Sequence, residues 1–136
     1  MIPFQAKSLP LPGTNYKEVY KSVVKIYSGI EKRTKRKPYL RSVYFRKQKI
    51  FFDYFWPHLL QKPFPERVRR LKFFPAAIEL IKESRNHPLT VQNPSKRTEA
   101  LHRFTGISKD KKLFFVQIKE NKRTGKKQLM SIFPAK

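Results

Sequence analysis

Residues 100–133 decide the fold class of this chain, and they read ALHRFTGISKDKKLFFVQIKENKRTGKKQLMSIF. Apolar and polar residues alternate in three segments of this stretch, which are residues 100–107, 113–119 and 128–133. Such alternation is typical of strands that bury one face. Turn-forming residues separate the segments, with Ser108 opening the first turn and Gly125 lying in the second. The stretch therefore predicts an antiparallel meander of three strands.

Upstream of the meander, apolar residues recur at the longer spacing of helices. The expected helices cover residues 15–30, 49–61 and 66–84. Thr14 or Asn15 is the expected N-cap of the first helix, and Pro75 should bend or split the third. The remaining segments are an irregular arm over 1–13, a short strand from residue 40, and a loop over 86–95.

This order predicts a single α+β domain over residues 1–136. An N-terminal helix is followed by a β-α-α-β-β-β order, with the helices packed on one face of an antiparallel sheet. If Phe114, Val116, Ile118, Met130 and Ile132 face the helices, alternation places Gln117, Lys119 and Ser131 together on the opposite face.

The charge of the chain is far from balanced, because 32 Lys and Arg stand against 9 Asp and Glu, for a net charge of +23. A folded domain with this excess repels itself unless an anionic partner neutralises it. Hydrophobic residues make up 39% of the chain, but 12 Phe and 6 Tyr supply the apolar area of a folded core rather than a disordered basic tail. The sequence therefore predicts a folded domain with a polyanionic partner.

The basic residues gather in clusters on several expected elements, which favours a footprint on nucleic acid over scattered solubilising charges. The candidate nucleic-acid-binding residues are Lys32, Arg33, Lys35, Arg36, Lys37, Arg67, Arg69, Arg70, Lys72, Gln117, Lys122 and Arg123. No apolar run is long enough to cross a membrane, and no secretory signal pattern is present. We expect a cytoplasmic protein that binds nucleic acid, RNA in preference to DNA, and no membrane.

Several enzyme classes are excluded by missing residues. The chain has no Cys, its acidic residues are scattered, and His58, His87 and His102 lie far apart without metal-ligand spacing. It also lacks the glycine-rich phosphate loop, the dinucleotide fingerprint and the serine-hydrolase motif. We therefore expect neither a metal site nor a cofactor.

RNA cleavage remains open because RNA carries its own nucleophile, the 2′-hydroxyl, and needs only proton transfer and cations on the phosphate. The meander supplies four candidate catalytic residues, which are His102, Arg103, Lys119 and Ser131. The phase of the first strand is ambiguous. If Phe104 faces inward, Arg103 faces outward and His102 inward, whereas Leu101 facing inward does the reverse.

From residue 40 onward, the element order resembles the RelE-like toxins, with their BrnT-like relatives, of the barnase/colicin/RelE superfamily of metal-independent ribonucleases. The resemblance is carried by LHRFTGI at 101–107, LFFVQIKEN at 113–121 and QLMSIFP at 128–134, which are similar to the strand pattern of phage and mobile-element members of that group. It implies a RelE-like core over 40–134, with the helix at 15–30 as an addition.

The resemblance further implies an RNA-cleaving toxin or processing nuclease that acts through Arg103, Lys119 and Ser131, with His102 as acid or base. A toxin of this kind would have an acidic antitoxin as partner. The alternative is a noncatalytic nucleic-acid-binding module of a mobile element or larger complex, because a fold can persist without its chemistry.

Overall fold

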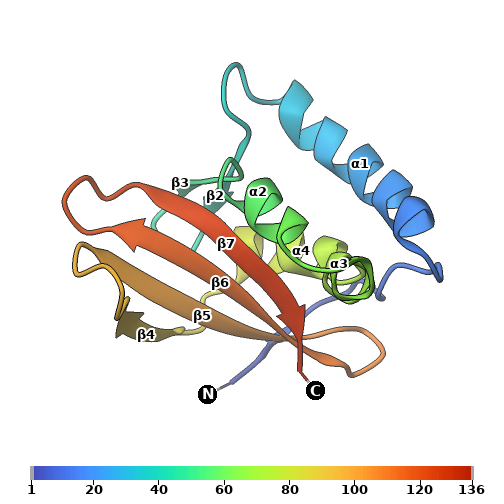
Figure 1. The fold of residues 1–136 in the computed structure, drawn as a ribbon. Coiled ribbons are helices and arrows are strands. Elements are labelled where there is room, and N and C mark those ends of the chain that lie inside the picture. Colours follow the sequence, from blue (N-terminus) through green and yellow to red (C-terminus); the bar gives the residue numbers. More distant parts are fainter. Residues whose placement is uncertain (1, 136) are drawn as a thin grey trace.

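A computed structural model describes residues 2–135, and within them the chain forms a mixed α/β fold with four helices and a curled seven-stranded sheet (Figure 1). In chain order the elements are β1 (Phe4–Gln5), α1 (Tyr16–Lys32), β2 (Tyr39–Ser42), β3 (Gln48–Phe51), α2 (Phe55–Leu60), α3 (Phe64–Leu71), α4 (Phe74–Glu83), β4 (Leu89–Gln92), β5 (Glu99–Ile107), β6 (Leu113–Asn121) and β7 (Lys127–Pro134).

The predicted meander is present as β5, β6 and β7, which pair antiparallel in chain order. One detail of its phase differs from the expectation. A register shift between β6 and β7 pairs Gln117 with Ser131 but Ile118 with Leu129, so Met130 is the extra residue of a bulge. The bulge buries Leu129 and sets Met130 beside Gln117: the sulfur of Met130 accepts a hydrogen bond from Nε2 of Gln117 over 3.4 Å, and Met130 also borders the small space under α2.

The sheet is mixed, and the prediction of a purely antiparallel sheet is wrong. Its strands run in the order β1-β5-β6-β7-β3-β2, with β4 also pairing with β5. β1 pairs with β5 in parallel, and β3 pairs with β7 in parallel through Ile50 and Phe51. In both parallel pairs, the two strands are far apart in the chain and are joined by a long connection rather than by a hairpin turn.

Three short strands were missed by the sequence analysis. The expected helix over 49–61 begins as β3 and becomes helical only at Phe55; the expected loop over 86–95 contains β4, and the arm contains β1. Because β1 precedes α1, the chain does not begin with the helix. These strands are two to four residues long, so they show too little alternation for their period to be recognised, and partner strands supply their hydrogen bonds.

The predicted helices at 15–30 and 66–84 are found with small changes of boundary. Asn15 caps α1, because its side-chain oxygen accepts a hydrogen bond from the backbone N–H of Glu18 over 3.0 Å. The third expected helix, over 66–84, is split into α3 and α4. Pro75 lies in the first turn of α4, where its missing N–H breaks no helical hydrogen bond.

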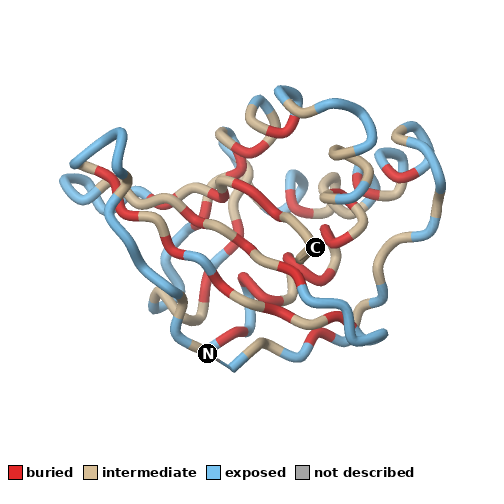
Figure 2. The backbone as a smooth tube through the Cα atoms, turned by 60° about the horizontal axis from the view of Figure 1, so that its bottom comes forward, coloured by how far each residue is buried: buried red, intermediate tan, exposed pale blue. Residues whose placement is uncertain are grey.

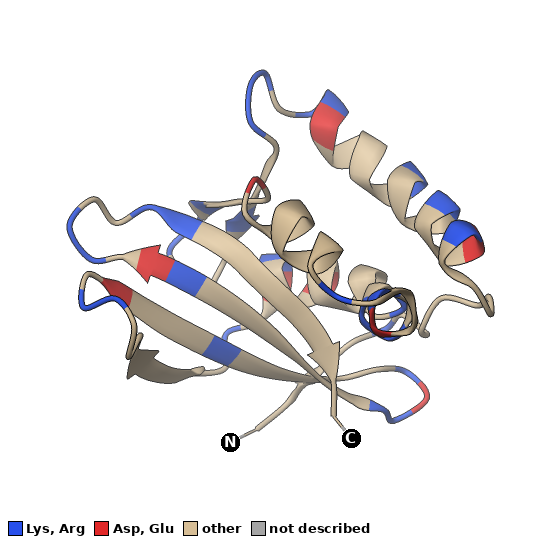
Figure 3. Cartoon of the chain, in the orientation of Figure 1, with Lys and Arg blue, Asp and Glu red and all other residues tan. Residues whose placement is uncertain are grey.

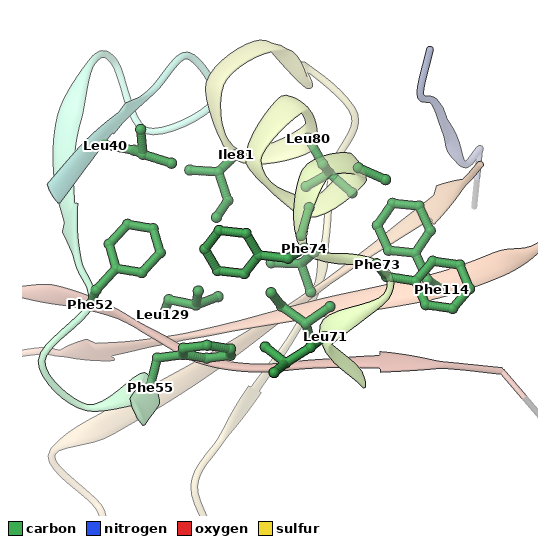
Figure 4. Close-up of a cluster of buried hydrophobic side chains, with 14 of the residues drawn as sticks. Leu40, Phe52, Phe55, Leu71, Phe73, Phe74, Leu80, Ile81, Phe114 and Leu129 are labelled. Carbon is green, nitrogen blue, oxygen red and sulfur yellow. The ribbon is translucent and has the colours of Figure 1, made fainter. Parts of the chain in front are cut away.

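The core is built from Phe and Leu together, so Phe does not replace Leu there. Figure 4 shows Phe52, Phe55 and Phe74 packed with leucines between α4 and the sheet, and all three are at most 1% exposed. Buried residues run along the strands and helices, while the loops that connect them are exposed (Figure 2). At Gly106 a Cβ would overlap the ring of Phe114 and lie 2.9 Å from Cδ1 of Leu80, so only glycine fits there.

The helices form two layers over the sheet. α4 contacts β2, β5 and β6, whereas α2 and α3 cover β7 beyond its short pairing with β3. α1 lies outside them, against α3, α4 and β2 (Figure 1). Within residues 2–135, every helix is too short or too polar to span a bilayer. On the meander face opposite α4, side chains of β5 and β6 are partly or fully exposed, whereas α2 covers that face at Ser131 on β7.

Candidate nucleic-acid interface

The face of the meander opposite α4, here called the open sheet face, carries the odd-numbered residues of β5 and β6. Phe104 on β5 and its partner Val116 on β6 are buried, so the neighbouring Arg103 and its partner Gln117 point the other way. Of the two phases that the sequence left open, the structure therefore has the one with Phe104 inward. His102 and Arg103 lie on opposite faces of the sheet.

Arg103 is exposed on the open sheet face and is held by neutral side chains. Its Nε and Nη2 atoms donate to Oε1 of Gln117 over 3.4 and 3.3 Å, and its guanidinium lies 5.8 and 5.3 Å from the ring centres of Phe115 and Phe133. Within the part of the chain that the structure describes, Arg103 has no acidic partner. Its charge is oriented but uncompensated, which suits an anion.

Lys119 lies on the same face but is already paired. Its ammonium is 3.2 Å from Oε2 of Glu99 and 3.9 Å from the ring centre of Tyr54, and the side chain is only 16% exposed. Burial would raise the pKa of Glu99, but hydrogen bonds from Asn93 and Lys119 and the charges of Lys119 and Lys96 outweigh it and lower that pKa. Lys119 would have to leave an ion pair to bind a phosphate.

His102 is buried on the opposite face, in a network that joins β4, β5, β6 and β7. Its Nε2 atom lies 2.8 Å from Oε1 of Glu120, and its Nδ1 atom lies 2.8 Å from Oγ1 of Thr90. A carboxylate only accepts hydrogen bonds, so Nε2 donates to Glu120, while Nδ1 and the Thr90 hydroxyl share the second hydrogen bond. Glu120 also pairs with the buried Lys127 over 3.6 Å. Every polar atom of the imidazole is thus used inside the fold.

Ser131 is opposite Gln117 in the register, yet it is only 7% exposed because α2 covers it. The structure therefore does not bring the four predicted catalytic residues into one cleft. Arg103 and Lys119 share the open sheet face, Ser131 lies under α2 beside that face, and His102 lies behind it.

His58 on α2 is a titratable group that the sequence analysis treated as structural. It stacks on Tyr54 at 5.4 Å and contacts the same small space as Ser131. Burial lowers the pKa of His58, and the charges of Lys62, Arg70 and Lys119 lower it further. The aromatic spacing of Tyr54 and His58, four residues apart, was the one signal in the sequence for this pair.

A second basic surface, here called the hairpin groove, lies between the loop that follows α1 and the β2–β3 hairpin. It is an open groove of about 680 Å³ lined by Arg33, Lys35, Arg36, Lys37, Tyr39, Lys49 and Phe51. Figure 3 shows the basic loop at one end of α1, above the sheet. The sequence analysis identified the loop cations but missed Tyr39, Lys49 and Phe51, which only the hairpin pairing brings to them.

The cations of the hairpin groove are largely unpaired. Among residues 2–135, Arg33, Lys35, Arg36 and Lys49 form no ion pair. The acid beside the groove is Asp53, which pairs with Lys37 over 3.4 Å and with Lys126 over 3.6 Å. Burial would raise the pKa of Asp53, but the hydrogen bond from Gln128 and these two cations outweigh it and lower that pKa.

The other predicted binding residues differ in whether their side chains are already bound to other parts of the protein. On α3, Arg67 donates to the backbone oxygens of Leu60 and Lys62, and Glu66 pairs with Arg69 and Arg70 over 2.7 and 3.0 Å. The remaining residues keep exposed or half-exposed positions: Lys32 at the end of α1, Lys72 after α3, Gln117 on the open sheet face, and Lys122 and Arg123 in the turn after β6.

Comparisons with protein-family models, with curated proteins and with solved structures found no match to this chain. No group of three or more His, Asp or Glu side chains within residues 2–135 is arranged to hold a metal ion. The candidate site is therefore defined by its own geometry, as two basic surfaces with aromatic rings, the open sheet face and the hairpin groove.

Proposed function

We propose that this protein binds nucleic acid, RNA in preference to DNA, through the hairpin groove. The observation that carries the proposal is the concentration of Arg33, Lys35, Arg36 and Lys49 around one groove without an acidic partner. Four like charges held close together raise the local potential, and a polyphosphate lowers that energy by replacing many small counterions. The preference for RNA rests on the resemblance of the meander to RNA-cleaving proteins.

The test is the salt dependence of binding. Fluorescence anisotropy with labelled RNA, single-stranded DNA and duplex DNA should show affinity falling steeply between about 50 and 200 mM salt. The double variant Lys35→Ala/Arg36→Ala should weaken binding to all three and flatten the salt dependence, with RNA bound tightest by the wild type. A matched control is Lys21→Ala/Lys25→Ala on the exposed side of α1, which should change neither the affinity nor its salt dependence. A flat salt response of the wild type would contradict the proposal.

A second candidate function is metal-independent RNA cleavage at the open sheet face, in keeping with the RelE-like resemblance. The observation that favours it is Arg103, an exposed and unpaired guanidinium, on the side of the sheet where Tyr54 links Lys119 to His58. A lowered pKa keeps the imidazole of His58 neutral at physiological pH, so it can accept a proton. His58 takes the place that the sequence analysis gave to His102.

In this mechanism the 2′-oxygen attacks the adjacent phosphorus as His58 removes its proton. The bond to the 5′-oxygen breaks, the leaving oxygen takes a proton from water, and a 2′,3′-cyclic phosphate and a 5′-hydroxyl form. Arg103 neutralises the charge that builds on the phosphate oxygens. Such a nuclease in the cytoplasm would require an acidic protein, an antitoxin, to cover its cations.

The cleavage test uses excess EDTA and compares RNA with the same strand carrying 2′-O-methyl groups. Cleavage of the unmodified strand alone, lost in Arg103→Ala and His58→Ala, supports this candidate. Cleavage of the methylated strand contradicts it, and binding without any cleavage leaves the noncatalytic module as the function.

A further inference from the structure

We infer that the hairpin groove takes single-stranded nucleic acid, with unpaired bases stacking on Tyr39 and Phe51; this rests on the proposed binding function and names its ligand. Charge alone does not distinguish single strands from duplexes, because both present phosphates. The two rings are what adds this distinction, since only an unpaired base offers its face to an aromatic side chain.

The pairing of β2 with β3 places the two rings together. Tyr39 pairs with Phe51 in the antiparallel register, and the ring centres lie 5.8 Å apart in an edge-to-face arrangement. Their neighbours Leu40 and Ile50 are buried, so Tyr39 and Phe51 occupy the opposite face, where both line the hairpin groove. Both rings are half-buried and line the groove.

Three cations lie against the two rings. Nζ of Lys49 lies 4.7 Å and Cζ of Arg41 5.5 Å from the centre of the Tyr39 ring, and Nζ of Lys126 lies 5.4 Å from that of Phe51. These contacts orient the rings. Long Lys and Arg side chains can move from a ring face to a phosphate, because the charge gains a stronger partner there.

The groove also has the composition of surfaces that bind single strands without reading sequence. Such surfaces combine a basic groove that follows the backbone with aromatic rings on which successive bases stack. In the hairpin groove the loop cations Arg33, Lys35 and Arg36 form one wall and the rings of the hairpin form the other. The ligand class is therefore a single strand, RNA or DNA, rather than a duplex.

The test compares ligands of equal charge. Anisotropy titrations of the wild-type protein at one ionic strength use a labelled single strand, an abasic strand with the same number of phosphates, and a duplex. Stacking predicts that the base-bearing strand binds about tenfold tighter than the abasic strand for each base engaged. RNA and DNA versions of the base-bearing strand should both show this ratio, since both carry aromatic bases.

Variants test whether the two rings cause the difference in affinity between the base-bearing and the abasic strand. Tyr39→Leu and Phe51→Leu should each reduce the ratio of base-bearing to abasic affinity and leave the abasic affinity unchanged, whereas Tyr39→Phe should keep the ratio. The control is Phe64→Leu on α3, a ring that is 60% exposed outside the groove, which should also keep it. Equal affinities of wild type for base-bearing and abasic strands, with a steep salt response, would overturn the stacking inference alone. Absence of salt-dependent binding to any ligand would overturn the proposed function itself.

Discussion

Two basic segments look alike in the sequence but differ in the fold. The loop after α1 reads RTKRK at 33–37, and α3 carries Arg67, Arg69 and Arg70 within four residues. In the loop, Arg33, Lys35 and Arg36 have no ion pair within residues 2–135. On α3, Glu66 pairs with two of the three arginines, and the third holds backbone oxygens.

The difference arises from where the helix places its acid. Glu66 precedes Arg69 by three residues and Arg70 by four, the spacings at which side chains on a helix meet. Glu31 lies two residues before Arg33, where the helix is ending, and makes no such pair with any residue from 2 to 135. A count of basic residues therefore overstates the charge that α3 presents to a ligand, while the loop presents nearly all of its charge.

The largest effect should come from removing the free cations. The triple variant Arg33→Ala/Lys35→Ala/Arg36→Ala should weaken RNA binding about 50- to 100-fold at moderate salt, because each lost phosphate contact reduces both affinity and salt slope. Its thermal stability should equal that of wild type, since these side chains form no ion pair with the acids of the described chain, residues 2–135. Unchanged affinity, measured by anisotropy, would remove the groove from the binding surface.

A smaller effect is expected on stability, where substitutions on the two faces of β5 should differ in their cost. His102→Ala should lower the free energy of unfolding by about 2 kcal/mol, because it leaves Thr90 and Glu120 without their buried partner. Arg103→Ala should change it by less than about 1 kcal/mol, since an exposed cation–π contact contributes little. Urea denaturation of both variants checks this, and equal losses would argue against the assigned phase of the strand.

Arg67→Ala tests the expectation that the arginines of α3 stabilise the fold rather than bind RNA. It should lower the free energy of unfolding by about 1 to 2 kcal/mol through the loss of two charged hydrogen bonds to backbone oxygens. RNA affinity should change by less than about threefold, because Arg67 is already committed to the fold. A stable variant with strongly reduced affinity would place α3 in the interface.

The smallest effect concerns pH. Burial would raise the pKa of Glu66, but hydrogen bonds from Arg70 and Arg69 outweigh it and lower that pKa, as other partners do for Glu99 and Asp53. The unfolded chain therefore binds these protons more readily than the folded chain. Stability should be complete above about pH 5 and decline as the pH falls further. Glu66→Gln should flatten this decline slightly, because its pairs are partly exposed.

The sequence predicted the longer elements because their periods repeat. The meander strands and α1 each span enough residues to show their period, and Pro75 marked the division between α3 and α4. The β2–β3 hairpin was missed partly because its loop ends in Arg46 and Lys47, whose φ angles are 56° and 64°. Glycine or asparagine usually signals such a turn, and neither is present here.

The candidate site was predicted less completely than the fold. The loop cations 33–37 were found as a charge cluster, but Tyr39 and Phe51 lie twelve residues apart in sequence and meet only through strand pairing. Likewise, which of His102 and Arg103 faces out depends on whether Phe104 or Leu101 is buried, and packing against the rest of the fold decides that. The sequence also did not show which acidic side chains pair with which basic ones, and this pairing decides which cations are free to bind a ligand.

The central claim is that the hairpin groove, and not α3, meets the nucleic acid. The most direct measurement is the change in backbone amide NMR shifts when a short single-stranded RNA is added to the whole protein. The account predicts the largest changes at residues 33–39 and 48–51, with small changes over 64–72. Largest changes over 64–72, or none in the hairpin, would contradict it.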